Sequence, residues 1–143
     1  GLFARPGVSA QDQSLIEQVL KSTGEFLWVQ QEADLDTVTA LSGSGPAYVF
    51  YFLEAMTEAG VKMGLPEAQA YHLAKATFGG ATHLARQSTE SPEVLRQRVT
   101  SKGGTTYAAL TSMADDHVKE AFVKAMLAAQ KRAGELGDEF GKD

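Results

Sequence analysis

The chain has 143 residues, no cysteine, 22% charged residues and a formal net charge of −5. The missing cysteines exclude disulfide and thiolate chemistry, and the acidic balance without a basic cluster argues against a nucleic-acid partner. No apolar run approaches the roughly 18 residues of a membrane span, and no signal peptide opens the chain. We therefore expect a cytoplasmic protein with neither a nucleic-acid nor a membrane partner.

The first 33 residues predict a strand, a helix and a second strand. Ser9 is a good N-cap, with Asp12 as its capping-box partner, and apolar residues follow at helical spacing. Gly24 is expected to stop this helix, and residues 25–31 are short, aromatic and β-branched, as in a strand. Because residues 1–5 resemble the end of a strand and lack an initiator Met, we expect a piece of a longer protein that retains the end of an α/β domain.

After residue 34 the sequence predicts only helices. Pro46 suits the first position of a helix that runs to about Met63, and Pro92 suits the start of a short helix. Further helices are expected over residues 66–87 and 118–133, and the polar tail from Gly134 is expected to fray.

Two of these helices carry patterns that indicate a second subunit. Residues 48–53 are apolar on every face, and a helix of this kind must be buried on all sides. Gly79 and Gly80 stand together inside the next helix, where each glycine costs about 1 kcal/mol relative to alanine. We expect close packing of another backbone there, although a kinked surface helix is the alternative.

Residues 100–106 (TSKGGTT) form the most informative stretch of the chain. Gly103 and Gly104 lie between small hydroxyl residues, and a helical pattern begins directly after them. The first N–H groups of a helix lack intrahelical partners, so such a loop suits a carboxylate or a phosphate. The alternative is an ordinary turn capped by Thr105. A valine at Gly104 would also strain the backbone if φ there is positive.

Other candidate sites fail on their spacing. The three histidines (His72, His83 and His117) lie far apart, and without cysteine no metal site is expected. Ser44 in the sequence Gly-Ser-Gly has no recognisable triad partners. Residues 43–48 begin like a dinucleotide fingerprint, but Tyr48 occupies the third glycine position. No cofactor-binding residue is therefore expected in this chain.

Residues 39–48 (TALSGSGPAY) and 95–106 (LRQRVTSKGGTT) together resemble the C-terminal part of the pyrroline-5-carboxylate reductase family, and the similarity covers nearly the whole chain. The resemblance implies a mainly α fold. Residues 1–33 would be a short β-α-β remnant of the Rossmann cofactor domain, and residues 34–143 a helical dimerisation and substrate-binding domain. The family reduces 1-pyrroline-5-carboxylate to L-proline, in proline biosynthesis, with NADPH or NADH. It implies a homodimer and allows a higher homo-oligomer built from dimers.

The resemblance also implies the roles of individual residues. The substrate carboxylate would bind the loop formed by Ser101, Gly103, Gly104, Thr105 and Thr106, and Ser44 and Val99 would line the same region. The hydroxyls of Thr39 and Thr106 are the candidate catalytic groups, because either could hydrogen-bond the imine nitrogen or relay a proton.

Three features of the sequence depart from the family pattern. Lys102 stands where many members have proline, and Gln87 and Thr89 stand where some members carry a glutamate. Glu90 is close by but offset, so an acidic role is left unassigned. The nucleotide would be bound mainly by an N-terminal domain that this chain does not contain, so we expect the isolated chain to be inactive.

Two other interpretations stay open at this point. The chain could be a helical dimerisation module without a catalytic role, or the helical domain of a related hydroxy-acid dehydrogenase. Such a dehydrogenase would place a lysine on an interior helix, for which Lys62 and Lys75 are candidates. A GxGxxG motif encoded upstream would favour the reductase.

Overall fold

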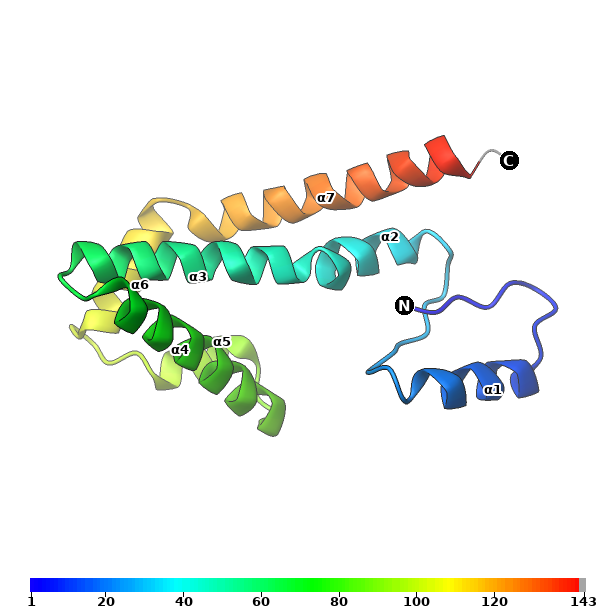
Figure 1. Ribbon diagram of the computed structural model, residues 1–143, viewed down its shortest axis with the longest axis horizontal. Helices are drawn as coiled ribbons and strands as arrows, with labels where there is room; N and C mark the ends of the chain where they lie inside the picture. The colour runs from blue at the N-terminus through cyan, green and yellow to red at the C-terminus, as the bar shows by residue number, and fades with distance from the viewer. Residues whose placement is uncertain (142–143) are drawn as a thin grey trace. The chain divides into compact units, whose positions relative to one another are not determined.

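The computed structural model describes residues 1–141 and is mainly helical, as the sequence predicts. Its elements are α1 (Ala10–Leu20), α2 (Asp34–Val38), the π-helical turn η1 (Thr39–Gly43), α3 (Gly45–Lys62), α4 (Glu67–Gln87), α5 (Pro92–Arg98), α6 (Thr105–Asp115) and α7 (Val118–Phe140) (Figure 1). The chain forms two compact units. Unit 1 combines Gly1–Gly45 with the segment from Val123 onward, and unit 2 is Pro46–Phe122. The division expected after residue 33 stays a prediction.

The capping box of α1 in unit 1 is confirmed. The Asp12 N–H donates to Ser9 Oγ at 3.2 Å, and the Ser9 N–H donates back to the Asp12 carboxylate at 3.1 Å. The hydrogen bonds from the Ser9 side chain and backbone lower the pKa of Asp12, because they stabilise its charged form.

The two expected strands are not present among the described residues. Leu2 and Trp28 form one isolated parallel bridge, in which the Leu2 N–H donates to the Leu27 carbonyl and the Val29 N–H donates to the Leu2 carbonyl, both at 2.8 Å. The prediction of a strand over residues 25–31 was therefore wrong, because the structure has a single bridge at Trp28 in place of a strand. Two extended segments with no third strand beside them are marginal in water, so aromatic and β-branched composition does not suffice for a ladder.

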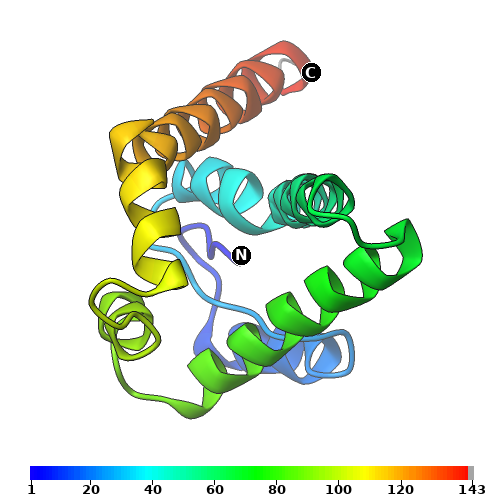
Figure 2. The ribbon, with the colours of Figure 1, turned by 90° about the vertical axis from the view of Figure 1, so that its left-hand side faces the viewer.

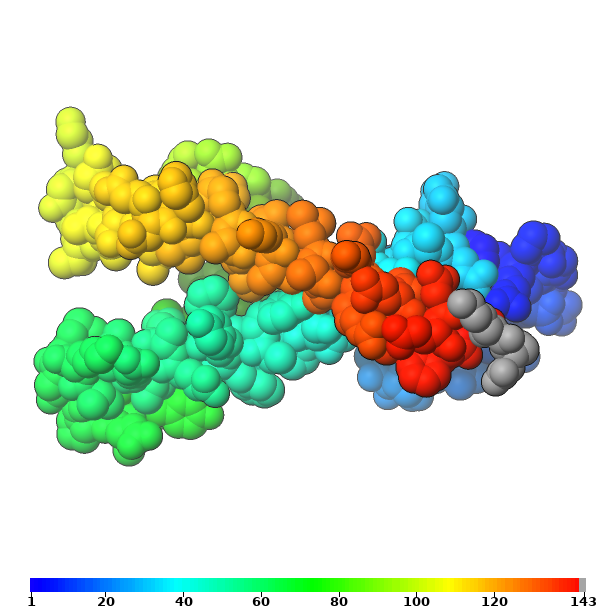
Figure 3. Space-filling model, turned by 90° about the horizontal axis from the view of Figure 1, so that it is seen from above, coloured from blue at the N-terminus to red at the C-terminus, as the bar shows by residue number. Residues whose placement is uncertain are grey.

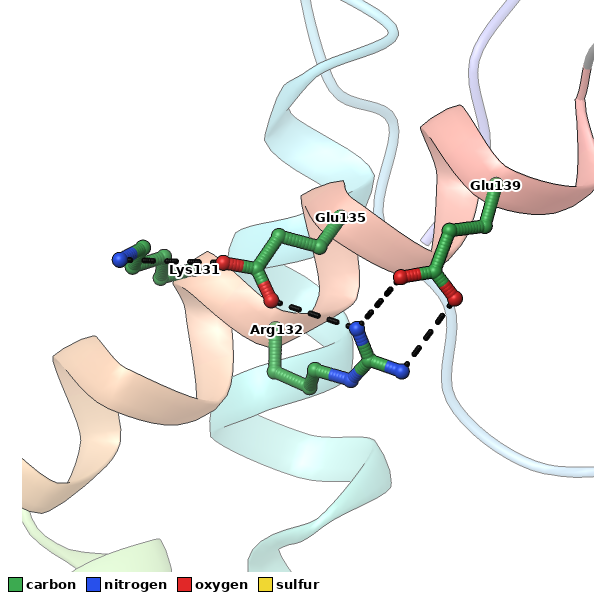
Figure 4. Close-up of polar contacts among 4 residues, drawn as sticks. All are labelled: Lys131, Arg132, Glu135 and Glu139. Atoms are coloured by element: carbon green, nitrogen blue, oxygen red, sulfur yellow. Dashed lines mark hydrogen bonds and ion pairs between the residues drawn. The ribbon is translucent and has the colours of Figure 1, made fainter.

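Helix α7 continues through Phe140, which corrects the expectation that the chain frays from Gly134. Arg132 contacts Glu139 at 2.8 Å and Glu135 at 3.3 Å on the same helical face (Figure 4). The helix also packs on α2 within unit 1, where Gln130 Nε2 donates to Thr37 Oγ1 at 2.7 Å. Contacts of this kind offset the low helix propensity of the glycines in this segment.

Unit 2 begins with helices α3 and α4, which meet near the turn between them and diverge from there (Figure 2). The turn between them contains Gly64 at φ +100°, and the Leu65 N–H donates to the Gly60 carbonyl at 3.0 Å. Gly60 and Ala70 are both buried where the two helices meet, and a Cβ at Gly60 would lie only 2.6 Å from the Ala70 Cβ. The small residues therefore set the distance between the helices.

An aromatic cluster ties α3 to the first turns of α7 inside unit 2. The Phe122 ring lies edge-on to the Tyr48 ring at 5.7 Å and meets the Phe52 ring at 5.4 Å between centroids. These rings cover one side of α3 only. On the remaining surface of the helix, Phe50 is 60% exposed and Tyr51 is 68% exposed.

The described residues bury very little apolar surface by themselves. Their buried hydrophobic side chains are Ala40, Leu53, Ala70 and Ala74. A Cβ built on Gly79 or Gly80 meets nothing within 4 Å, so no described part of the same chain makes the close approach expected there. A second subunit as the missing partner stays a prediction. None of the described helices combines the length and apolarity that a membrane crossing requires.

Candidate functional site

The loop between α5 and α6 is held by short-range hydrogen bonds at both ends. At the end of α5, the Thr100 hydroxyl donates to the Arg96 carbonyl at 2.6 Å and the Thr100 N–H donates to the Gln97 carbonyl at 3.0 Å. Before α6, the Gly104 N–H donates to the Ser101 carbonyl at 3.0 Å. The loop is therefore a defined double turn rather than an open connection.

The two glycines of this loop have different functions in the turn. Gly103 has φ +75°, a left-handed conformation that glycine adopts without steric cost. Gly104 has φ −81°, so the backbone strain considered for a valine there does not arise from φ. Gly104 is instead confined by space, because a Cβ on it would lie 2.6 Å from Ser101 Oγ and 3.3 Å from the Ser101 carbonyl oxygen.

The start of α6 presents unused hydrogen-bond donors. Gly104 is the N-cap and no side chain caps the helix, which excludes the alternative of a turn capped by Thr105. Within the described part of the chain, the backbone N–H groups of Thr105, Thr106 and Tyr107 donate no hydrogen bond, and neither does the Thr106 hydroxyl. Helix α6, yellow in Figure 3, lies at the surface of unit 2.

An open groove follows α6 from the glycines towards its C-terminal end. Gly103 and Gly104 line one end of the groove, and Asp115 and Asp116 line the other. An anion is favoured at the glycine end, where the free N–H groups and the positive end of the helix dipole lie, and is disfavoured by the carboxylates at the far end.

Thr39 and Ser44 lie at a different element, the π-helical turn η1 of unit 1, which begins at Thr39 and has Ser44 as its C-cap. The Ser44 N–H donates to the Thr39 carbonyl at 2.8 Å, which spans five residues instead of the four of an α-helix. The sequence gives no signal for this turn. Single π-turns occur frequently at functional sites, because the extra residue alters which backbone groups are free.

The predicted site residues thus form two groups. Unit 2 brings together the contiguous group Val99, Ser101, Gly103, Gly104, Thr105 and Thr106, and unit 1 holds Thr39 and Ser44. The binding and catalytic assignments of both groups stay predictions. Among residues 1–141, no cluster of three or more acidic or histidine side chains could hold a metal ion.

One contact near the loop was missed by the sequence analysis. The Arg98 guanidinium donates to Glu90 Oε1 and forms an ion pair across the whole of α5. The available signal was the pair of opposite charges that flank a short helix, with Glu90 before its N-cap and Arg98 as its last residue.

Comparison with known proteins identifies relatives of this chain. The family described as pyrroline-5-carboxylate reductase dimerisation matches residues 32–136. The pyrroline-5-carboxylate reductase of Pseudomonas aeruginosa is 42% identical over 142 residues, which cover 99% of this chain and 52% of that protein. Pyrroline-5-carboxylate reductase 2 of Bacillus subtilis is 39% identical and is matched over 98% of this chain and 50% of its own length.

A comparison with solved structures finds the same kind of enzyme. A pyrroline-5-carboxylate reductase from Coxiella burnetii superposes with a TM-score of 0.89 at 40% identity, over 95% of this chain and 50% of that one. The pyrroline carboxylate reductase of Plasmodium falciparum, solved with NADP bound, gives 0.84 at 30% identity, over 93% and 50% of the two chains. The chain thus spans about half the length of these relatives. Its family match covers most of the helical region, and the chain belongs to the pyrroline-5-carboxylate reductase family.

Proposed function

We propose that this chain is part of an NAD(P)H-dependent reductase that converts 1-pyrroline-5-carboxylate to L-proline. The observation that carries the proposal is the set of free N–H groups at the start of α6, within the loop whose sequence matches the family motif. They offer a carboxylate several donors at the positive end of a helix dipole. Family membership, rather than the loop alone, favours this substrate over other small anions.

The proposed reaction adds a hydride to the imine carbon and a proton to the imine nitrogen. The hydride comes from the reduced nicotinamide, which we assign to a cofactor domain outside this chain. Within the chain, the N–H groups of Thr105 and Thr106 and the residues Ser101, Gly103 and Gly104 would hold the carboxylate and so orient the ring. Ser44 and Val99 are the remaining residues that we assign to substrate binding.

Two hydroxyls are proposed as partners of the imine nitrogen. The Thr106 hydroxyl donates no hydrogen bond within the described residues, so it is available to a ligand. Thr39 is exposed at the start of the π-helical turn. Either could hydrogen-bond the nitrogen or pass it a proton.

Thr106→Ala in the full-length reductase is expected to lower kcat/KM for pyrroline-5-carboxylate about 10- to 150-fold. This range corresponds to one charge-assisted hydrogen bond of roughly 1.5–3 kcal/mol. The KM for the nucleotide should change little. Thr77→Ala is the matched control, because the Thr77 hydroxyl donates to the Leu73 carbonyl on the surface of α4. Steady-state kinetics with each substrate varied in turn measures both parameters.

The result that contradicts the carboxylate loop is a Thr106→Ala enzyme with weakened nucleotide binding and unchanged imino-acid parameters. A full-length protein that folds, binds NADPH and does not reduce pyrroline-5-carboxylate would instead favour a dimerisation module or a related dehydrogenase.

We also propose that the chain forms a homodimer through its helices, and that higher assemblies are built from this dimer. The matched family is described as a dimerisation region. The exposed rings of Phe50 and Tyr51 and the open surface at Gly79 and Gly80 give the subunits apolar surface to bury. Burial of apolar surface is the main driving force of such association.

Sedimentation equilibrium at micromolar concentration is expected to give twice the chain mass of 15.3 kDa, or a multiple of that value. The physical reason is that the isolated chain lacks a core large enough to fold alone. A stable folded monomer, with helical circular dichroism and a cooperative melt, would contradict the proposed dimer.

A further inference from the structure

The ion pair between Glu90 and Arg98 spans α5 from its beginning to its end. Glu90 lies immediately before the N-cap Ser91, and Arg98 is the last residue of this seven-residue helix. Helices of this length are marginal on their own, because few hydrogen bonds offset the cost of nucleation. A contact that joins both ends therefore holds α5 in its conformation and sets the direction in which the chain leaves it.

The Glu90 side chain is half-buried and only partly satisfied. It is 30% exposed, whereas Arg98 is 66% exposed. Its Oε1 accepts the hydrogen bond from Arg98, but its buried Oε2 has no hydrogen-bond partner in the described part of the structure. A buried acceptor without a partner costs stability, so folding alone does not explain a glutamate at this position.

A continuous series of contacts leads from this ion pair to the free donors of α6. Thr100, two residues beyond Arg98, binds back onto the last turn of α5 through its hydroxyl and its N–H. The Gly104 N–H then closes the next turn on the Ser101 carbonyl at 3.0 Å. A rotation of the end of α5 would thus be passed on to the loop, since no free segment lies between them.

We propose that the Glu90–Arg98 ion pair is a brace that positions the loop from Ser101 to Thr106 for a carboxylate ligand. Glu90 and Arg98 are positioning residues, because they act through the backbone of α5 and not by touching the ligand. The identity of the ligand rests on the proposed function, but the brace itself concerns only the structure of unit 2. Because Arg98 is mostly exposed, loss of the pair should disturb the loop much more than the overall stability.

The test uses Glu90→Ala, Arg98→Ala and the double variant in the full-length reductase. Each is expected to raise KM for pyrroline-5-carboxylate about tenfold, since small displacements of positioning groups have large kinetic effects. The double variant should resemble either single variant, because both substitutions open the same contact. KM for NADPH and the melting temperature should stay close to the parent values.

Glu93→Ala is the matched control. Glu93 lies on the same helix and accepts a hydrogen bond from Gln97 at 3.3 Å, but this contact does not join the two ends of α5. Glu90→Gln is the second variant, in case the alanine variant folds poorly, and should change KM in the same direction by a smaller factor.

Amide hydrogen exchange of residues 99–106, measured without substrate, separates this inference from the proposed function. The Gly104 N–H should exchange faster in Glu90→Ala and at the parent rate in Glu93→Ala. Parent exchange rates in Glu90→Ala, or additive effects in the double variant, would overturn the brace. If the parent enzyme does not reduce pyrroline-5-carboxylate, the proposed function fails, and exchange alone then decides whether the brace exists.

Discussion

Gly60→Val is expected to destabilise the protein by about 3 kcal/mol, the upper end of the usual cost of overpacking a buried contact. A Cβ at this position would lie 2.6 Å from the Ala70 Cβ and 3.4 Å from its Cα, so the clash involves backbone and cannot be relieved by a rotamer change. The two helices would have to separate, which would also disturb the burial of Ala74 and Leu53. Urea unfolding at a fixed protein concentration measures the change.

Gly137→Val is the matched control for Gly60→Val. It places the same residue inside helix α7, where a Cβ meets nothing within 4 Å. Valine has a slightly higher helix propensity than glycine, so this variant should be as stable as the parent or more so. Equal free energies of unfolding for the two valine variants would show that the contact between Gly60 and Ala70 does not restrict the size of the residue at position 60.

Gly103→Val in the full-length reductase is expected to lower kcat/KM for pyrroline-5-carboxylate by about 100-fold or more, because donors displaced by about 1 Å lose that much. Gly103 has φ +75°, which is strongly unfavourable for a β-branched residue. The loop should therefore relax to another conformation and move the N–H groups of Thr105 and Thr106. Steady-state kinetics for both substrates, with KM for the nucleotide as the internal reference, measures the effect.

Gly64→Val controls for backbone strain at Gly103. Gly64 has φ +100° in the turn between α3 and α4, with nothing within 4 Å of a built Cβ. Gly64→Val should lower the free energy of unfolding about as much as Gly103→Val does, and its kcat/KM for pyrroline-5-carboxylate should equal that of the parent enzyme. If both variants lose activity in parallel with stability, the glycine loop has no specific role in substrate binding.

Most helix boundaries of unit 2 could be predicted from the sequence, because they depend on neighbouring residues. Pro46, Pro66 and Pro92 each occur within the first turn or directly before a helix, and Gly64 takes the left-handed conformation after α3. Proline and glycine restrict the backbone locally, so their effect does not depend on the rest of the fold.

The features that the sequence could not predict depend on distant residues. The extension of α7 to Phe140 is accompanied by packing on α2, where Gln130 binds Thr37. The segment at Trp28 is a single bridge because a ladder needs neighbouring strands. The π-helical turn at Thr39 lies between α2 and α3 and has no periodic signal in the sequence. At the candidate site, the loop and its glycines were recognisable, whereas the opposite charges of Glu90 and Arg98 that flank α5 were a weaker signal, which only the folded helix shows to be an ion pair.

In the proposed homodimer, the scarcity of buried side chains among the described residues would make the stability of the protein depend on its concentration. Where folding and association are one process, dilution shifts the equilibrium towards the unfolded monomer. The melting temperature should then rise with protein concentration. The rate of refolding should fall on dilution, because association of two chains is a second-order step. An assay at nanomolar enzyme could therefore report dissociation as loss of catalytic competence, so comparisons between variants need matched subunit concentrations.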